Sequence, residues 1–495
     1  MRGEYDAIVI GTGLGGAASA AVMASEGLRV LVLEKNTRMG GVCAAYEKRG
    51  FTIDIGTHMF SRGAAGPLGA IARRVGAAVP RFCQPADLAV CTGFGAHITV
   101  PRDLYRYPLF LLDAYRQLRV RPWELPGIYR FFRDVVAMPE YAIVKLDRVT
   151  MFDFLTRYTK NPHLIGLFGF LLGLYFILPL REVSAGEGVW CFQRMARDRA
   201  LSYPLGGSQA VPATLMAAAA GHGARVELRA EVVRIHVDGG RARGVELADG
   251  RVFEAPVVVG TTSLKDHVNR LVGPAHFPES YVSRVTGIQG SMIAVQAKIA
   301  LKKPLVRAGA VVGGHSDIFD LNNLKVEDFD RMYEDVVAGR VTRATPIYAP
   351  VPTNFDSTLG PRGCQLITAC AVAPTLDIPL VDSPARWIDN MMLTLERIIP
   401  GLHVSSLFID TMDVRFIQRW MGKTGGSAVS TGQVVGQVGN RRPPVRTPIV
   451  GLYVCGDGAG ARGVGTELAA RSGELAADTV ICDYVNGLLG VAPRI

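Results

Sequence analysis

A glycine-rich turn lies at the beginning of the chain, between a short apolar segment and a run of small residues. Residues 7–10 read Ala-Ile-Val-Ile and lead directly into residues 11–16, Gly-Thr-Gly-Leu-Gly-Gly, which an alanine-rich segment follows. The order predicts a strand, a tight turn and a helix. Gly11 permits the turn, Gly13 lets the backbone approach a pyrophosphate, and Gly16 lets the helix pack on the strand.

An acidic residue ends the second strand of this predicted unit. Residues 30–33 are apolar, and Glu34 follows them. Its carboxylate can accept hydrogen bonds from both ribose hydroxyls of a dinucleotide and would repel a 2′-phosphate, so NADP is disfavoured. The N-terminus of the helix adds unpaired N–H groups and a partial positive charge for the phosphates. The spacing therefore indicates a dinucleotide, although glycine triplets alone are weak evidence in a chain with 56 glycines.

A second glycine-rich turn lies near the other end of the chain. Residues 451–457 read Gly-Leu-Tyr-Val-Cys-Gly-Asp, and a further glycine-rich stretch and an alanine-rich helix pattern follow. Residues 203–262 return to the style of the first segment, with Gly-Gly and Asp-Gly turns between alternating strands that indicate a β-meander. Together the two ends favour FAD as the dinucleotide.

The predicted fold class is α/β, in an interleaved two-domain flavoprotein. We expect a Rossmann-like FAD domain, with a parallel sheet and a β-meander, from residues 1–75, 203–265 and 441–495. Residues 76–202, which are rich in helix-period stretches, form an insertion that faces substrate or membrane. Residues 266–440 complete a mixed α+β substrate domain with a helical, apolar part. Active sites often lie between two domains, so we expect the active site at the interface of these two.

An uncharged segment lies within the first insertion. Residues 164–180 contain no charged side chain, and Gly166, Gly169 and Gly173 fall on one helical face. Seventeen positions are at the lower edge of what can span a bilayer. We rank a buried or tunnel-lining helix first, a segment at the membrane surface second, and a true span last.

The composition limits the partners. The net charge is +10, and residues 105–112 and 129–133 mix arginine with aromatic and leucine side chains, which suits an anionic membrane face as well as an ordinary amphipathic helix. No basic stripe interleaved with stacking aromatics indicates nucleic acid. The scattered cysteines and histidines imply no metal. We expect a cytoplasmic protein without a signal peptide, with peripheral contact at the inner face of the membrane left open.

Five stretches of the chain also match the pattern of a known family. The fingerprint with Glu34, residues 38–41, 54–58 and 203–207, and residues 442–473 occur in the order typical of it. The chain resembles the phytoene desaturase-type flavoproteins of the amine oxidase superfamily, which include carotenoid desaturases, carotenoid isomerases and retinol saturases.

The resemblance implies roles for particular residues. Val232 would meet the adenine through its backbone, and Asp457 would bind the ribityl hydroxyls. The helix that begins near Gly465 would direct its N-terminal dipole at the flavin, which favours an anionic reduced ring. The cofactor-binding residues expected on this basis are Gly11, Gly13, Gly16, Glu34, Lys35, Arg38, Gly41, Val232, Gly456, Asp457 and Val464.

The catalytic candidates are Glu467, Arg462 and His58. Glu467 is either an acid/base or a cap of its helix, and Arg462 would hold a substrate carboxylate or the anionic edge of the flavin. His58 could face the flavin, but a structural histidine bonded to the backbone is the favoured interpretation. Lys298 is on a strand where amine oxidases sometimes place a flavin-facing lysine, and we interpret it as an exposed strand lysine.

The polar groups around residue 462 differ from the carotenoid desaturase pattern, so a substrate with a polar head is an alternative to a pure hydrocarbon. Only one dinucleotide fingerprint is present, so electrons would pass to oxygen or a quinone, or return to the substrate. The predicted function is a FAD-dependent oxidoreductase that desaturates, saturates or isomerises a lipophilic polyene or isoprenoid by hydride transfer at flavin N5. The alternatives are a flavin amine oxidase and a non-catalytic prenyl- or lipid-binding protein of the same fold.

Overall fold

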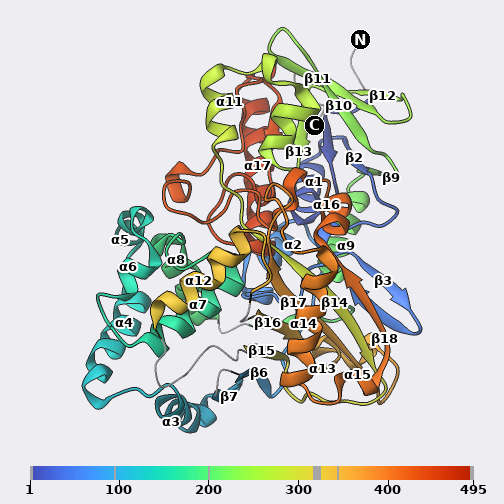
Figure 1. Ribbon diagram of the computed structural model, residues 1–495. Coiled ribbons are helices and arrows are strands. Elements are labelled where there is room, and N and C mark those ends of the chain that lie inside the picture. The colour runs from blue at the N-terminus through green and yellow to red at the C-terminus, as the bar shows by residue number, and fades with distance from the viewer. Residues whose placement is uncertain (1–3, 94–95, 199–200, 316–324, 343–344, 491–495) are drawn as a thin grey trace.

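The computed structural model describes residues 4–93, 96–198, 201–315, 325–342 and 345–490 (Figure 1). Two sheets lie at opposite ends of the molecule. A group of helices from the first half of the chain packs beside the lower sheet as drawn, and the last helix returns to the upper one, next to the first strand (Figure 1).

The upper sheet is parallel and has the order β19-β13-β1-β2-β9. Its central strands read as continuous apolar runs because helices and a meander cover both faces, whereas the edge strand at residues 225–228 contains Arg225 and Glu227. Three separated parts of the chain supply them: β1 (Ala7–Ile10), β2 (Val30–Glu34), β9 (Arg225–Leu228), β13 (Val257–Gly260) and β19 (Leu452–Val454).

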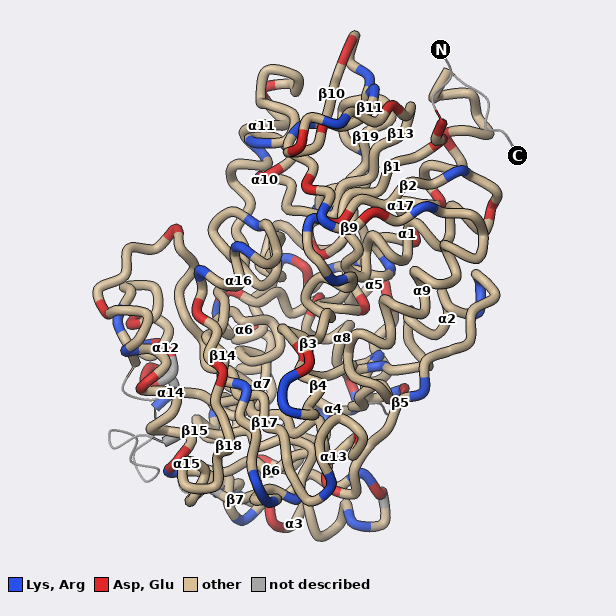
Figure 2. The backbone as a smooth tube through the Cα atoms, turned by 90° about the vertical axis from the view of Figure 1, so that its right-hand side faces the viewer, with Lys and Arg blue, Asp and Glu red and all other residues tan. Residues whose placement is uncertain are grey.

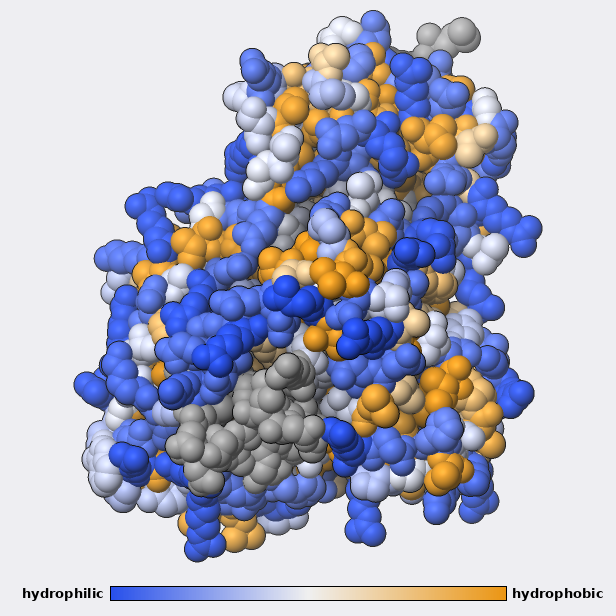
Figure 3. Space-filling model, viewed as in Figure 1, coloured by the Kyte–Doolittle hydropathy of each residue, from blue (hydrophilic) through white to orange (hydrophobic). Residues whose placement is uncertain are grey.

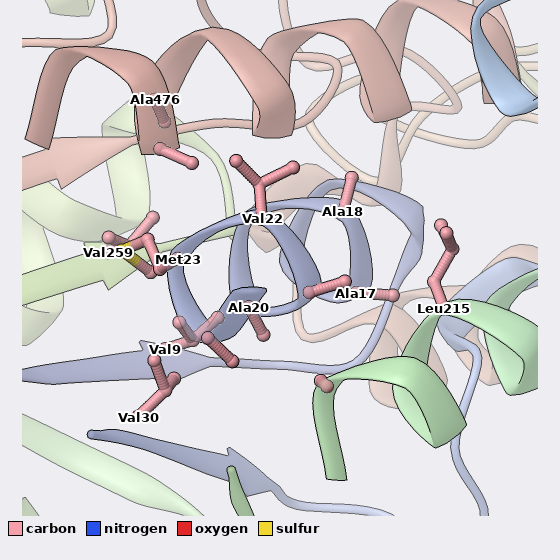
Figure 4. Close-up of a cluster of buried hydrophobic side chains, with 14 of the residues drawn as sticks. Val9, Ala17, Ala18, Ala20, Val22, Met23, Val30, Leu215, Val259 and Ala476 are labelled. Atoms are coloured by element: carbon pink, nitrogen blue, oxygen red, sulfur yellow. The ribbon is translucent and has the colours of Figure 1, made fainter. Parts of the chain in front are cut away.

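Three helices cover one face of this sheet: α1 (Leu14–Ser25), α9 (Ala210–Gly221) and α17 (Gly465–Val485). The small residues of α1 let its neighbours approach closely, and Figure 4 shows Val22 facing Ala476 of α17. A Cβ atom added to Gly473 would lie 2.1 Å from the carbonyl oxygen of Gly15, so only glycine fits at this crossing.

The predicted β-meander is confirmed. It consists of β10 (Val232–Asp238), β11 (Arg241–Leu247) and β12 (Val252–Glu254), and its apolar side packs on the other face of the parallel sheet. Gly239 and Gly240 have positive φ angles of 55° and 71°, as a two-residue hairpin turn requires.

The lower sheet has seven strands in the order β18-β14-β17-β16-β15-β6-β7. Five come from the second insertion: β14 (Ile293–Leu301), β15 (Ala310–His315), β16 (Thr345–Pro350), β17 (Gln365–Ala373) and β18 (Ser406–Met412). The other two, β6 (Asp87–Gly93) and β7 (Ala96–Pro101), belong to the first insertion, for which the sequence had indicated helices. Since β6 pairs in parallel with β15, one sheet joins the two insertions.

The helical part of the first insertion contains the uncharged segment. Helix α7 begins at Pro162, where Asn161 caps it, and ends at Phe176. Its three glycines are buried, and a Cβ atom at Gly173 would lie 2.1 Å from the Tyr333 hydroxyl of α12. Gly173 thus packs against another helix, and the burial of the three glycines agrees with the expectation of a buried helix. Among the described residues, no helix is long and apolar enough to cross a bilayer.

The remaining elements connect these layers. They are β3 (Ala45–Lys48), β4 (Phe51–Asp54), α2 (Pro67–Arg74), β5 (Phe82–Cys83), α3 (Tyr107–Gln117), α4 (Leu125–Ala137), α5 (Glu140–Lys145), α6 (Met151–Leu155), α7 (Pro162–Phe176), α8 (Ala185–Asp198), β8 (Tyr203–Pro204), α10 (Leu264–Asp266), α11 (Glu279–Thr286), α12 (Val326–Val337), α13 (Pro352–Phe355), α14 (Pro384–Ile398), α15 (Leu402–Ser405) and α16 (Val414–Met421).

Candidate functional site

The turn from β1 into α1 forms a cradle with open space above it. Gly11 has a φ of +96°, and a Cβ atom at Gly16 would lie 2.0 Å from the Gly11 carbonyl oxygen. A Cβ atom at Gly13, in contrast, would meet nothing within 4 Å. Gly41 closes against Gly13 from the following loop, since its own Cβ would lie 3.1 Å from the Gly13 Cα. The space at Gly13 is where a pyrophosphate would meet backbone N–H groups.

The Glu34 carboxylate lies beside this cradle. It is buried, and it accepts hydrogen bonds from the Thr12 amide at 2.9 Å, the Thr12 hydroxyl at 2.6 Å and the Asn36 amide at 2.9 Å. Both bonds from Thr12 go to Oε2 and the bond from Asn36 goes to Oε1, so the carboxylate is fixed and Oε1 keeps one further acceptor position. The Ala230 amide donates to the Glu34 carbonyl oxygen at 2.9 Å, which brings the segment before Val232 to the same strand end.

Two expected cofactor ligands bind backbone carbonyls. The Lys35 ammonium donates to the Arg419 carbonyl oxygen near the end of α16, and burial lowers the pKa of Lys35. The Arg38 guanidinium donates to the Ala45 carbonyl oxygen at 3.0 Å. These bonds hold the loop after β2 in place, and cofactor contacts by Lys35 and Arg38 stay predictions.

The turn after β19 lies against the first cradle. A Cβ atom at Gly15 would lie 2.9 Å from the Gly456 Cα. Asp457 accepts hydrogen bonds from the Lys423 ammonium and, at 2.9 Å, from the Ser430 amide. Burial by itself would raise the pKa of Asp457, but the Lys423 charge and these hydrogen bonds outweigh it and hold the pKa below its ordinary value. Asp457 is therefore ionised where ribityl hydroxyls are expected.

Helix α17 begins next to this turn. Val464 precedes its first residue, Gly465, which has a φ of +59° and nothing within 4 Å of an added Cβ. A 21-residue helix thus directs its unpaired N–H groups at open space.

Glu467 connects the first turn of α17 to the loop after β4. Its carboxylate accepts hydrogen bonds from the Ser61 hydroxyl at 2.7 Å and the Arg62 amide at 2.8 Å, and none from the N–H groups of its own helix. The interpretation of Glu467 as a helix cap is therefore wrong. The Ser61 hydroxyl also lies 3.0 Å from the Tyr175 hydroxyl at the end of α7. Burial raises the pKa of Glu467, although the bonds from Ser61 and Arg62 oppose it.

His58 begins the same loop, and the interpretation of it as a structural histidine bonded to the backbone is wrong. It is buried, and neither ring nitrogen makes a hydrogen bond within the described part of the chain. Burial, together with the Lys298 charge, lowers the pKa of His58 well below its ordinary value. The ring is therefore neutral, although the neighbouring Gln296 side chain and Thr57 backbone act on its pKa in the opposite direction.

Lys298 lies beside His58, and its interpretation as an exposed strand lysine is also wrong. The side chain is fully buried on β14, and its ammonium donates to the Gln296 side-chain oxygen at 2.7 Å. Burial lowers the pKa of Lys298, while the nearby Asp54 opposes this shift. Burial likewise raises the pKa of Asp54, whose Oδ2 makes no hydrogen bond to any described residue. The sequence places Lys298 in a strand, but only the packing of β4 against β14 encloses its side chain.

Arg462 is tied to protein carboxylates. Its guanidinium pairs with Asp147 and, at 3.1 Å, with Glu187 of α8. Glu187 also accepts from the Gly463 amide at 2.5 Å. These pairs attach the helices of the first insertion to the turn before α17. A contact of Arg462 with substrate or flavin stays a prediction.

Two residues around this turn were not predicted from the sequence. Arg442 is buried and donates to the carbonyl oxygens of Thr431 and Asp457, while its Nε and one terminal nitrogen make no hydrogen bond to the part of the chain that the structure describes. It lies in a stretch that carried the family resemblance, but its burial leaves no sequence signal. Lys423 belongs to a Gly-Lys-Thr triplet that resembles the end of a phosphate loop and lacks its upstream glycine.

Two regions therefore meet at the loop of residues 55–62. On one side, the N-termini of α1 and α17 face open space that suits a dinucleotide. On the other, His58, Lys298 and Glu467 supply buried groups that can hold or pass a proton. No three His, Cys, Asp or Glu side chains of the described residues gather as metal ligands.

Comparisons with known proteins agree with this arrangement. The family model described as flavin containing amine oxidoreductase matches residues 14–481. Prolycopene isomerase of Arabidopsis thaliana is 24% identical over 97% of this chain and 83% of its own. The zeta-carotene-forming phytoene desaturase of Myxococcus xanthus is 26% identical over 74% of this chain and 72% of its own. The crystal structure of an oxidoreductase from Methanosarcina mazei superposes with a TM-score of 0.70 at 19% identity, covering 96% of this chain and 99% of its own.

Proposed function

The chain belongs to the flavin-containing amine oxidoreductase family and is an oxidoreductase of the phytoene desaturase type, and from this premise we propose its substrate class. We propose a FAD-dependent enzyme that desaturates, saturates or isomerises a lipophilic polyene or isoprenoid. Membership of the family implies a flavin, and the cradle at Gly13 with the fixed Glu34 carboxylate supports FAD as its form.

The residues of the cradle suit the two halves of FAD. Gly11, Gly13 and Gly41 would leave room for the pyrophosphate, and Glu34 would accept the ribose hydroxyls. Asp457 would bind ribityl hydroxyls in its ionised form. When bound, the flavin supplies a hydride acceptor and donor at N5. The domain boundaries given above belong to the same proposal.

One observation supports the proposal of a lipophilic substrate. Tyr175 lies in the last turn of the apolar helix α7, and its hydroxyl is linked through the Ser61 hydroxyl to Glu467 in the first turn of α17. An apolar helix 15 residues long, about 22 Å by its rise, thus leads to the proposed flavin edge. A recess between α7 and α12 is lined mainly by apolar side chains, among them Ile165, Phe170 and Met332.

Proton transfer falls to this chain's own residues. Glu467 keeps its proton to higher pH than an exposed glutamate, because burial raises its pKa. Ser61 and Tyr175 extend it by a hydrogen-bonded relay into α7. Desaturation needs one proton acceptor in addition to the hydride acceptor, and we assign this role to Glu467. His58 stays neutral beside the same loop, because burial and the Lys298 charge oppose its protonation.

A flavin amine oxidase is the second candidate, and the burial of Lys298 on β14 is the observation that favours it. Against it stands the length of the apolar helix α7, since an amine needs a more polar entry. The non-catalytic lipid-binding protein is disfavoured by the intact cradle at Gly13.

The test begins with purified holoenzyme. We expect a flavin absorbance spectrum and a bound hydrophobe of polyene or isoprenoid mass in the lipid extract. Incubation of that lipid in detergent, with and without a quinone, separates redox products from isomers. Turnover of primary amines without turnover of lipid would favour the amine oxidase, and colourless protein that FAD cannot reconstitute would refute both enzyme functions.

Glu467→Gln tests the relay. We expect bound flavin at the wild-type level and product formation reduced by about 10²-fold or more, because the amide cannot hold the acidic proton. Glu474→Gln, in the same helix at a position bonded to Arg74 and Arg471, is the matched control and should keep activity. For a substrate of this class, we also propose that the protein makes peripheral contact with a membrane.

A further inference from the structure

The helices α3 and α4 expose an unusual share of large apolar side chains. Eleven of the twenty-six large hydrophobic side chains that are exposed among the described residues lie within residues 105–144. Helix α3 contains the run Leu-Phe-Leu-Leu and yet has no buried residue. Scattered single apolar residues need no explanation, but a concentration of this kind indicates a binding surface.

We call this surface the α3–α4 face. Its most exposed apolar members are Tyr105, Leu109, Leu111, Trp123 and Tyr129. Both views place α3 at the end of the molecule opposite the parallel sheet, with α4 in the same half of the molecule (Figures 1 and 2). Apolar side chains appear at the lower edge of the space-filling view, over α3 (Figure 3).

Positive charge accompanies these side chains. Residues 105–145 contain seven basic and four acidic residues. Arg116, Arg121 and Arg130 are exposed, and the Arg121 guanidinium lies over the Trp123 ring at 5.5 Å. Three of the four carboxylates are engaged within the protein: Asp113 accepts from Gln117, Asp134 pairs with Arg133, and Glu124 accepts from Asn161.

This combination of chemistry fits one kind of partner. Tyrosine and tryptophan rings prefer the boundary between lipid headgroups and acyl chains, and arginine stems lie along it while their charges meet phosphates. Each basic residue near an anionic bilayer adds to its attraction. A second copy of the chain fits less well, because a two-fold contact would bring the same positive surfaces together.

The face is also coupled to the candidate site. The Asn161 amide that caps α7 donates to Glu124, immediately before α4, at 3.0 Å, and the Phe131 ring of α4 lies 5.1 Å from Phe168 of α7. The other end of α7 reaches Glu467 through Tyr175 and Ser61. The face thus lies at the outer end of the apolar helix that leads to the proposed flavin edge.

We propose that the α3–α4 face docks on the surface of a bilayer that contains anionic lipids. Docking places the outer end of α7 against the acyl chains, so that a lipophilic substrate enters without crossing water. This last consequence rests on the proposed function, whereas the docking itself does not and is measured without substrate.

Vesicle flotation of the full-length holoprotein tests the docking. The probes are vesicles of phosphatidylcholine alone and of phosphatidylcholine mixed with phosphatidylglycerol. We expect binding to the anionic vesicles that weakens as salt is added, and little binding to neutral ones. Leu109→Ser with Trp123→Ser should reduce the partition coefficient at least about tenfold. Arg116→Glu with Arg130→Glu should reduce it by about fivefold or more per residue.

A matched control uses apolar side chains that are equally exposed elsewhere. Leu393→Ser with Val404→Ser changes residues of 66% and 73% exposure, against 72% for both Leu109 and Trp123, and should leave binding unchanged. Equal losses in both pairs, or no loss in either, would overturn the proposal. So would a dimer in solution that the Leu109 and Trp123 changes convert to a monomer, since the face would then bind a second copy.

Activity separates this proposal from the proposed function. In detergent, the Leu109→Ser, Trp123→Ser protein should keep wild-type flavin content and turnover. Its turnover should decrease only when the substrate is supplied in vesicles. Vesicle binding without turnover of any lipid would refute the proposed function and leave the docking supported.

Discussion

At the scale of single residues, the glycines of the first turn have two distinct functions. Gly16 is required by the protein itself, because its Cα lies against the Gly11 carbonyl oxygen. Gly13 is not, since its φ of −57° suits any residue and the space beside it is open. The space at Gly13 is therefore kept for a ligand.

This difference gives a prediction. Gly13→Val should abolish flavin binding, because Val fills the space that the ligand needs. The free energy of unfolding of the apoprotein should stay within about 0.5 kcal/mol of the wild-type value. Gly16→Ala should cost the apoprotein about 1–3 kcal/mol, because its Cβ would overlap a backbone oxygen. Absorbance spectra and urea unfolding measure both, and a Gly13→Val protein with full flavin occupancy would contradict the assignment.

Lys298 gives a second prediction at this scale. Burial lowers the pKa of Lys298 from 10.5 to about 8, so the unfolded chain binds a proton that the folded chain releases between these values. The contribution of Lys298 to stability therefore increases as the pH rises through this window and is lost as the pH falls. Lys298→Met should stabilise the protein by about 1–4 kcal/mol at pH 7.

The stabilisation by Lys298→Met should shrink as the pH approaches 10.5. Lys303→Met changes an exposed lysine two residues after β14 and should show neither effect. Unfolding free energies measured across this pH range decide the matter. A Lys298→Met protein that is less stable than wild type at pH 7 would mean that the ammonium contributes more through its bond to Gln296 than its burial costs.

At the scale of elements, α7 combines a fixed packing face with an apolar course toward the candidate site. Its three glycines are buried, and the Tyr333 hydroxyl of α12 occupies the space that a side chain at Gly173 would need, while Leu180 lies next to Gly169. The other faces of α7 contribute to a separate apolar cluster with α4 and α6. Gly173 is therefore the position at which α7 and α12 depend on the absence of a side chain.

The contact between Gly173 and Tyr333 can be tested by a double substitution. Gly173→Ala should destabilise the protein by about 1–3 kcal/mol, because the new Cβ would lie 2.1 Å from the hydroxyl oxygen. Adding Tyr333→Phe removes that oxygen, and the next ring atom is 3.3 Å away, so much of the loss should return. Thermal unfolding of the four proteins measures the coupling, and strictly additive effects would contradict the packing described.

At the scale of the whole molecule, buried charges join parts that are distant in sequence. Asp147 and Glu187 of the first insertion pair with Arg462, near the C-terminal end of the chain, and Lys423 pairs with Asp457. Buried pairs contribute little net stability, yet removal of one partner leaves a charge without compensation. The two pairs of Arg462 therefore link the helical insertion to the proposed flavin domain, and the pair of Lys423 links the second insertion to it.

Glu187→Ala should cost about 1–3 kcal/mol and make the helical insertion more sensitive to protease, because Arg462 loses one of its two carboxylate partners and the buried Gly463 amide loses its acceptor. Asp238→Ala breaks an exposed pair with Arg243 in the meander and should cost less than about 1 kcal/mol. Urea unfolding and limited proteolysis of the full chain compare them. Equal small effects would show that the link is dispensable.

The sequence by itself determined the local units: the cradle at Gly13, the acid at Glu34, the meander hairpin at Gly239 and Gly240, and the buried glycine face of α7. The family resemblance, which rests on the fingerprint with Glu34 and on residues 38–41, 54–58, 203–207 and 442–473, is confirmed by the matched family model. Each unit depends on neighbours within a few turns of chain, where spacing and backbone freedom are visible as residue types.

Only the tertiary structure decided the environment of the polar side chains. Lys298 and His58 lose water because β4 packs on β14 from more than two hundred residues away, and Glu467 finds its donors at Ser61 and Arg62 instead of in its own helix. Strands β6 and β7 likewise join a sheet whose other members come much later in the chain. Burial and pairing depend on which distant segments meet, and that information is not contained in the spacing of neighbouring residues.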